Sequence, residues 1–244
     1  MGLNWGIFLE DAPFGGVKYY QWLLDGFLNT TALFLCAWVV AFVAGSAVGV
    51  FRTLPNRLLR LLGTVYVEIF RNIPLLVQFF LWYAVMPEIL PRSAGIWVKR
   101  IDPPVQFFIL SVICLGLFTG GRLAEQVRSG IEALSGGQRK AGLALGMTLA
   151  QTYRYILMPN AYRIIMPPLT SETLNLIKNS AVASSIGLIE LTFQAYRLLD
   201  YSANSYESFI AITLAYVFLC LAILTLMRFI ERRIRVTPAA RSRA

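Results

Sequence analysis

Five charged side chains lie within stretches of sequence that are otherwise apolar. Glu68 and Arg71 are three residues apart and would therefore share one face of a helix. If these stretches cross a membrane, each charge is costly at that depth, which indicates a functional role with a polar or charged partner. The alternative for Glu68 and Arg71 is a pair that neutralises itself and only shapes the bundle. The five residues are Arg122, Lys178, Glu172, Arg71 and Glu68.

Several kinds of chemistry are excluded by residues that the chain lacks. It contains no His, which excludes an imidazole base and a His-ligated metal site. Cys36, Cys114 and Cys220 lie far apart in apolar runs, so we expect them to be small hydrophobic core residues. No segment matches the phosphate-binding pattern G-x-x-x-x-G-K-[ST]. We therefore expect no catalytic residue and no metal site.

The composition indicates an integral membrane protein. Of the 244 residues, 57% are apolar or aromatic and 14% are charged, whereas soluble domains have about 25% charged residues. The mean hydropathy is +0.62. A chain of this composition has too little polar surface to cover itself in water, so a soluble enzyme is excluded.

Charge-free runs predict an all-α membrane protein that forms a single domain over residues 1–244. About 20 helical residues cross the hydrocarbon core. The sequence contains five stretches of about that length that are either uncharged or apolar with few charges. Prolines 74, 167 and 168 interrupt the second and fourth stretches, where we expect bends or breaks. Between the third and fourth spans lies a loop, residues 129–160. The five predicted spans cover residues 26–51, 61–87, 103–128, 161–184 and 206–230.

The distribution of Lys and Arg predicts the orientation. With the N-terminus outside, the inner segments 52–60, 122–163 and 228–244 hold 15 of the 22 basic residues, and the outer segments hold five. Basic residues favour the cytoplasmic side, so we expect N-out and C-in. The same excess of basic residues on the cytoplasmic side explains the net charge of +9, so binding of nucleic acid is not needed to explain it. The basic C-terminal end suits contact with anionic lipid. Residues 92–102 and 196–206 are predicted outer loops.

Small residues mark two places where backbones could approach closely. Ala41, Gly45 and Gly49 recur every fourth residue in the first span, as in tightly packed helix pairs, although chance is the alternative. In the 129–160 loop, Gly136 and Gly137 are expected to break the preceding helix. A short helix then covers residues 138–145 and is capped by Gly146. Pro159 is expected to end the next helix. A helix with so few side chains suits docking to a partner.

This loop resembles the EAA loop of ABC importer permeases. The order Ala141-Gly142, Gly146 and Pro159, with thirteen residues from Gly146 to Pro159, carries the resemblance. Lys140 stands where the family has Glu, and Gly142 stands where it has a second Ala. The resemblance implies a coupling helix in a cleft of an ATPase subunit, contacted through Lys140, Ala141, Gly142, Gly146 and Pro159.

Other segments narrow the resemblance to permeases for polar amino acids. Residues 66–78 and 176–188 are similar to the second-span and fourth-span signatures of the histidine/glutamine/glutamate group. Residues 4–8 and 151–178 look most like the longer permease subunit of bacterial glutamate/aspartate importers. The likeness implies the type I ABC importer permease fold in a bacterial inner membrane. It also implies import of glutamate and aspartate, or alternatively of glutamine or another polar amino acid.

The resemblance also implies partners. ATP and Mg would be bound by a dimer of ATPase subunits, and this chain would hold no cofactor. A second permease chain, similar but different, and an extracytoplasmic amino acid-binding protein would complete the complex.

Arg71, Arg122 and Lys178 would meet substrate carboxylates, and Glu172 or Glu68 would meet the substrate ammonium group. Arg122 could instead be an arginine that snorkels toward the cytoplasm. A stand-alone secondary transporter is the distant alternative, which would predict more spans with inverted repeats.

Overall fold

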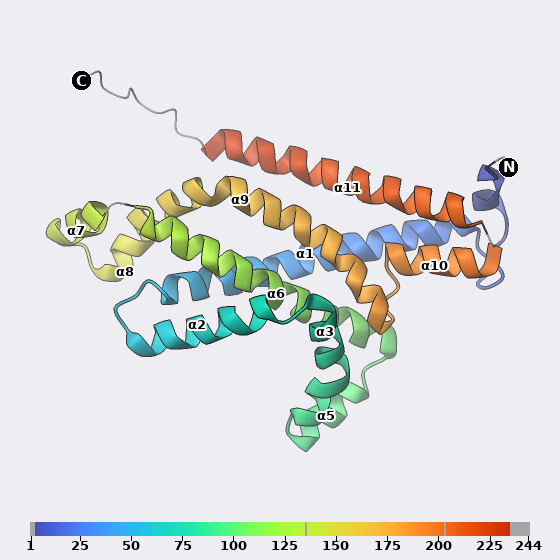
Figure 1. Ribbon diagram of the computed structural model, residues 1–244, viewed down its shortest axis with the longest axis horizontal. Coiled ribbons are helices and arrows are strands. Elements are labelled where there is room, and N and C mark those ends of the chain that lie inside the picture. The colour runs from blue at the N-terminus through green and yellow to red at the C-terminus, as the bar shows by residue number, and fades with distance from the viewer. Residues whose placement is uncertain (1–2, 135, 203, 235–244) are drawn as a thin grey trace.

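The computed structural model describes residues 3–134, 136–202 and 204–234, and these residues form an all-helical bundle (Figure 1). Four long helices run along the bundle: α1 (Tyr19–Phe51), α6 (Pro103–Glu132), α9 (Met158–Asn179) and α11 (Ser205–Ile234). The shorter elements are η1 (Trp5–Leu9), α2 (Arg57–Asn72), α3 (Leu75–Phe80), the π-helix η2 (Leu81–Val85), α4 (Met86–Ile89), α5 (Arg92–Lys99), α7 (Gly136–Ala144), α8 (Leu149–Thr152), the π-helix η3 (Tyr153–Leu157), the 3-10 helix η4 (Ser180–Ile186) and α10 (Leu191–Ser202).

Three of the predicted spans are single apolar helices. The helices α1, α6 and α11 are each long and apolar enough to cross a membrane. The second predicted span is a bent pair, in which α2 and the segment Leu75–Ile89 meet at 106°. By length and composition the described residues therefore contain three spans, or four spans if the bent pair is counted as a single span. α9, at about 33 Å, is long enough but less apolar, so the five-span topology stays a prediction.

The bend after α2 lies at the predicted proline. Ile73 and Pro74 are extended, with ψ of 128° and 138°, and so end the helix. The amide of Gln78 donates to the carbonyl oxygens of Phe70 and Ile73 at 3.0 and 2.9 Å. Backbone acceptors that the bend leaves open are thereby satisfied within the chain, as a membrane requires.

Prolines in the fourth predicted span behave differently. Pro167 and Pro168 lie inside α9, which continues through both, so of the bend or break expected there the break does not occur. Pro159 also does not end a helix. It lies where the π-helix η3 continues directly into α9, so the helix passes through it. The helical conformation of α9 instead ends at Asn179 and tightens into η4.

Three predicted loop features are also corrected. Residues 92–102 and 196–206, expected to be outer loops, largely form α5 and α10 with the start of α11. Both helices were missed because they are short and amphipathic rather than apolar. α6 ends at Glu132, and Gly136 and Gly137 begin α7 rather than breaking the helix before it.

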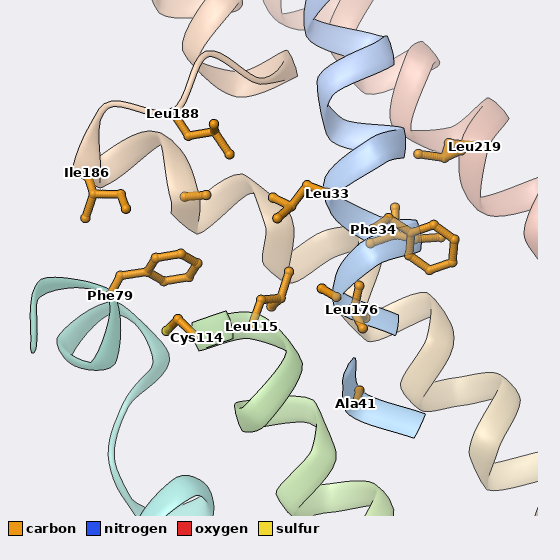
Figure 2. Close-up of a cluster of buried hydrophobic side chains, with 13 residues drawn as sticks. Leu33, Phe34, Ala41, Phe79, Cys114, Leu115, Leu176, Ile186, Leu188 and Leu219 are labelled. Atoms are coloured by element: carbon orange, nitrogen blue, oxygen red, sulfur yellow. The ribbon is translucent and has the colours of Figure 1, made fainter. Parts of the chain in front are cut away.

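The main core joins α1, α3, α6, α9, η4 and α11. Figure 2 shows Phe34, Phe79, Leu115 and Leu176, from four different elements, converging on one buried cluster. A second cluster joins α6 to η3 and α9 and includes Leu123 and Val127. Because these helices are fixed against one another, polar side chains on α2, α6 and α9 have defined positions.

The glycine repeat of α1 lies in the closest helix contact. Gly45 and Gly49 are buried against α6. A Cβ atom on Gly45 would lie 2.8 Å from the carbonyl oxygen of Gly120, and one on Gly49 would lie 2.6 Å from Cβ of Val127. The predicted close packing is confirmed, because no side chain fits at either position.

Candidate functional site

A polar cavity of about 390 Å³ lies between α2, α6 and α9, lined by Arg71, Arg122, Glu125, Gln126 and Glu172. Three of the five predicted charged residues therefore converge on one site, although 101 positions in the sequence separate Arg71 from Glu172. Each comes from a different helix.

Arg122 and Glu172 form an ion pair across this cavity. Nη1 of Arg122 lies 3.7 Å from Oε2 of Glu172, and the guanidinium lies 5.0 Å from the ring centre of Phe118. The side chain of Arg122 is 40% exposed and that of Glu172 is 16% exposed. Arg122 thus reaches into the cavity with a carboxylate partner, which argues against the snorkelling alternative.

Glu125 is the centre of a second charge cluster. Its carboxylate contacts Arg52 at the end of α1, accepts from Arg128 at 2.5 Å and lies 3.9 Å from Nη1 of Arg71. Arg128 also pairs with Glu132 at 2.5 Å. Three guanidinium groups therefore surround one carboxylate, and the region around Glu125 carries excess positive charge.

Gln126 supplies a neutral polar group to the same cavity. Its Nε2 donates to the carbonyl oxygen of Pro168 at 3.4 Å, which ties α6 to the proline segment of α9. Its Oε1 is buried and has no hydrogen-bond partner among the described residues. A buried acceptor without a partner is costly, so Oε1 favours a donor that enters the cavity.

Two predicted residues do not join the cavity. Glu68 is exposed and accepts from the amide of Asn72 at 2.8 Å. The Glu68–Arg71 pair considered above is therefore not formed, since Arg71 turns toward Glu125. Lys178 is exposed in the last turn of α9, six residues beyond Glu172.

Sequence reasoning omitted Glu125, Gln126 and Arg52 from the site. Glu125 follows Arg122 by three residues, and this spacing was the available signal. Gln126 carries no charge, and Arg52 stands at the end of a long apolar run like an ordinary flanking residue. Only the packing of α1 and α2 on α6 reveals the roles of these residues.

The predicted coupling segment forms a compact helical hairpin at one end of the bundle (Figure 1). Gly146 has a φ of +81°, and its N–H donates to the carbonyl of Leu143 while that of Met147 donates to Gly142. This is a Schellman cap, so the predicted cap is confirmed. Thr148 and Gln151 form a capping box at the start of α8.

The residues of α7 divide between an inner and an outer surface. Gly142 is buried, and a Cβ atom there would lie 2.9 Å from Cγ2 of Thr152 and 3.1 Å from Cδ1 of Ile156. Gly142 therefore packs the hairpin internally, whereas the other small residues of the segment, Ala141, Ala144 and Gly146, are exposed. Lys140 and Ala141 are exposed, and Leu145 is 81% exposed.

A bundle of long apolar helices with a charged cavity and an external helical hairpin is the arrangement expected of the membrane subunit of a transporter. The chain belongs to the family of binding-protein-dependent transport system inner membrane components, whose pattern matches residues 20–236.

Relatives and solved structures agree with this family. The chain is 57% identical to the glutamate/aspartate import permease protein GltJ of Escherichia coli (strain K12) over 234 residues, which cover 96% of this chain and 95% of that protein. It is 32% identical to the probable glutamine ABC transporter permease protein GlnM of Bacillus subtilis, over 88% of this chain and 94% of that protein. A crystal structure of an amino acid ABC transporter with histidines matches with a TM-score of 0.73 at 29% identity, over 88% of this chain and 95% of that one. The predicted ABC importer permease fold is confirmed.

Proposed function

We propose that this chain is a transmembrane subunit of an ATP-driven importer of glutamate and aspartate. The observation that carries the proposal is the polar cavity in which Arg71 and Arg122 each face a carboxylate. The high identity to a glutamate/aspartate import permease over nearly the whole chain supports the choice of substrate.

The charges of the cavity suit a substrate with two carboxylates and one ammonium. In the ion pairs Arg71–Glu125 and Arg122–Glu172 the atoms lie 3.9 and 3.7 Å apart, beyond hydrogen-bond distance. An incoming carboxylate can replace either glutamate with a shorter, two-pronged contact to arginine. The glutamate that is released can then accept from the ammonium group, so each charged group of the substrate meets a group of opposite charge.

Energy would reach this cavity through α7 and α8. We propose that the exposed surface of α7, with Lys140, Ala141 and Leu145, docks in a cleft of a partner ATPase that binds ATP and Mg. Pro159 and the internally packed Gly142 would hold that surface against the start of α9. Because α9 carries Glu172, movement of the hairpin would alter the Arg122–Glu172 pair.

The proposal includes the remaining partners and the orientation. A second, similar permease chain, an ATPase dimer and an extracytoplasmic binding protein would complete the complex in the bacterial inner membrane. The excess of Lys and Arg near α7 and the end of α11 supports N-out and C-in. The N-terminal segment and α10 lie at the opposite end of the bundle from α7 (Figure 1).

The test is the ATPase activity of the complete complex in nanodiscs. The binding protein would be added with glutamate, aspartate, glutamine or arginine, on wild type and on Arg122→Ala. We expect stimulation by glutamate and aspartate alone, weakened about tenfold by the substitution, the size of one lost charge-assisted hydrogen bond. Arg100→Ala, an exposed arginine outside the cavity, is the matched control. Stimulation by glutamine or arginine instead would contradict the substrate, and an unchanged Arg122→Ala would contradict the site.

A further inference from the structure

A second and larger cavity lies at the end of the bundle opposite α7. Its volume is about 640 Å³, within the range of roughly 300–1,000 Å³ that is typical of small-molecule sites. It is an open cleft bounded by the N-terminal segment, α1, the start of α6, the residues after η4, and α10. None of the five predicted charged residues lines it.

Two charged groups of opposite sign line this cavity without a partner. The guanidinium of Arg197 on α10 lies 3.9 Å from the ring centre of Trp22, which is 4% exposed. Stacking on the ring fixes the plane of the guanidinium and leaves its N–H groups available. Asp25 on α1 lines the same cavity. Among the described residues, neither Arg197 nor Asp25 has an oppositely charged side chain within 4.0 Å.

A buried acceptor adds an independent indication of a ligand. Gln194 on α10 lines the cavity and is 2% exposed, and its Oε1 has no hydrogen-bond partner among the residues that the structure describes. A Cβ atom on Gly26 would lie 2.9 Å from Cγ of Gln194, so the glycine allows this side chain to lie directly against α1. An unpartnered acceptor held this firmly favours a ligand that brings a donor.

The two cavities share one side of α6. Pro104 and Phe108 line the outer cavity, whereas Arg122 and Gln126 line the charged one. Each of the first pair lies 18 residues before its counterpart in the second. Eighteen residues are five complete helical turns, so the counterparts face the same direction at a separation of about 27 Å. The outer cavity therefore lies on the same side of α6 as the charged cavity.

We infer that the outer cavity is a receiving site for the zwitterionic head group that all α-amino acids share. Arg197 binds the α-carboxylate, while Asp25 and Oε1 of Gln194 accept from the ammonium group. The side chain of the amino acid then lies against Val105 and Phe108. This inference rests on the proposed function, and it assigns general head-group recognition to this site and discrimination of the side chain to the deeper cavity.

The test is equilibrium binding of radiolabelled amino acids to the complete complex in nanodiscs, without the binding protein and with Arg122→Ala in the deeper cavity, so that the binding reports the outer cavity. We expect L-glutamate and L-glutamine to bind with similar affinity and glutarate, which lacks the ammonium group, to bind at least about tenfold more weakly. Arg197→Gln and Gln194→Leu should each weaken glutamate binding about tenfold, the effect of one lost charge-assisted or buried hydrogen bond. Arg92→Gln, an exposed outer arginine that does not line the cavity, is the matched control.

A second variant keeps the inference testable if polar substitutions disturb assembly. Val105 is 49% exposed and lines the cavity, so Val105→Trp fills the space without removing a polar group. We expect it to block amino acid binding while the complex stays intact by size-exclusion chromatography. Unchanged glutamate binding in Arg197→Gln and Val105→Trp would overturn the inference.

Docking of the binding protein is the competing explanation for this surface. It predicts that Arg197→Gln weakens the affinity of the complex for the loaded binding protein and leaves binding of the free amino acid unchanged, which would also overturn the inference. Failure of the proposed function has a separate signature, namely wild-type ATPase that neither glutamate nor aspartate stimulates. The binding test would then use the amino acid that does stimulate the ATPase, because the proposed contacts involve the carboxylate and ammonium groups that all α-amino acids share.

Discussion

Arg122 on α6 and Glu172 on α9 face each other across a polar cavity with 3.7 Å between Nη1 and Oε2. This distance is a charge contact and not a hydrogen bond, so the guanidinium keeps its donors available. The pair joins the two helices whose relative movement would open or close the cavity. It therefore gives a direct test of how a carboxylate is bound and released.

Replacing Glu172 by Gln should hold an anionic substrate more tightly. Without its carboxylate competitor, Arg122 binds the substrate carboxylate more strongly in the ground state, which slows release. We expect glutamate retained by the complex without ATP to rise about threefold to tenfold and turnover to fall by a similar factor, as one partly screened ion pair would give. Glu68→Gln, at the exposed glutamate outside the cavity, should change neither. Weaker retention in Glu172→Gln would mean that the contact of Glu172 with the substrate ammonium group outweighs its competition for Arg122.

Glu125 should matter for stability because three arginines depend on it. Glu125→Gln removes the charge shared by Arg52, Arg71 and Arg128, and we expect a loss of about 2 kcal/mol. The measurement is the rate at which a thiol reagent labels Cys114, which is fully buried, in a chain whose other cysteines are Ser.

The control for Glu125 is another glutamate in an ion pair. Glu88 pairs with Lys99, and their side chains are 66% and 49% exposed. Glu88→Gln should cost less than about 1 kcal/mol, as exposed pairs do. Equal effects of the two substitutions would show that Glu125 is no more than a surface charge.

Adding one methyl group at Gly49 should disturb the contact of α1 with α6. The new Cβ would lie 2.6 Å from Cβ of Val127 and 2.8 Å from the carbonyl oxygen of Ala124. We expect Gly49→Ala to lower the stability by about 1–3 kcal/mol through overpacking, read by the same Cys114 labelling. Gly136→Ala, where no atom lies within 4 Å of the new Cβ, should leave the stability unchanged or raised. A neutral Gly49→Ala would mean that the two helices move apart freely.

Leu145 offers a test of the coupling hairpin. It is 81% exposed and lies outside the membrane in the proposed topology, so its apolar side chain lacks cover without a partner. Leu145→Ser should reduce co-purification of the ATPase subunit severalfold, consistent with about 1 kcal/mol lost by an apolar contact. Leu9→Ser, at a leucine of η1 that is 66% exposed at the other end of the bundle, should not. Full retention of the ATPase in Leu145→Ser would place the docking surface elsewhere.

The buried carboxyl group of Glu190 should make the stability of the folded protein depend on pH. It is fully buried between η4 and α10, where it accepts from the N–H of Phe193 and the hydroxyl of Tyr216. Burial raises the pKa of its carboxyl above the ordinary value, although these hydrogen bonds oppose the shift. A carboxyl with a raised pKa in the folded state contributes stability that is complete below its unfolded pKa. That contribution is lost as the pH rises through the folded pKa.

The substitution Glu190→Gln isolates this contribution. Gln keeps an acceptor for Phe193 but cannot ionise, so stability should fall less between acidic and neutral pH than in the wild type. Thermal unfolding in detergent across that range measures the difference. Glu88→Gln, at an exposed position, is the control and should follow the wild-type profile. A wild-type profile identical to that of Glu190→Gln would contradict the raised pKa.

The long apolar helices and the bend could be predicted because single residue types determine them. Charge-free runs indicated α1, α6 and α11, and Pro74 indicated the bend after α2. Gly146 likewise specified its own cap. The break allowed for at Pro167 and Pro168 does not occur, because whether a proline breaks a helix depends on its surroundings. In a bundle, packing against neighbouring helices, such as that of α9 on α6, keeps the helix continuous through both prolines.

Part of the site could be predicted because charges in apolar sequence are rare, but their partners could not be. Spacing alone paired Glu68 with Arg71, whereas the bundle pairs Arg71 with Glu125, 54 positions later. Ion pairs between helices depend on which faces pack together. Here the packing of α2 on α6 places Arg71 near Glu125, so the pair expected from the three-residue spacing of Glu68 and Arg71 does not form. The same dependence explains why Arg52 and Gln126 were missed.

The bend after α2 also has an electrostatic consequence. Because α2 ends at Asn72, Arg71 lies in its last turn, at the negative end of the helix macrodipole. The terminal carbonyl groups therefore place a partial negative charge beside a cavity that is lined by two guanidinium groups and two carboxylates. The peptide backbone itself acts as part of the counter-charge for Arg71. A straight helix through residues 72–75 would remove that counter-charge while leaving every ionisable side chain in place.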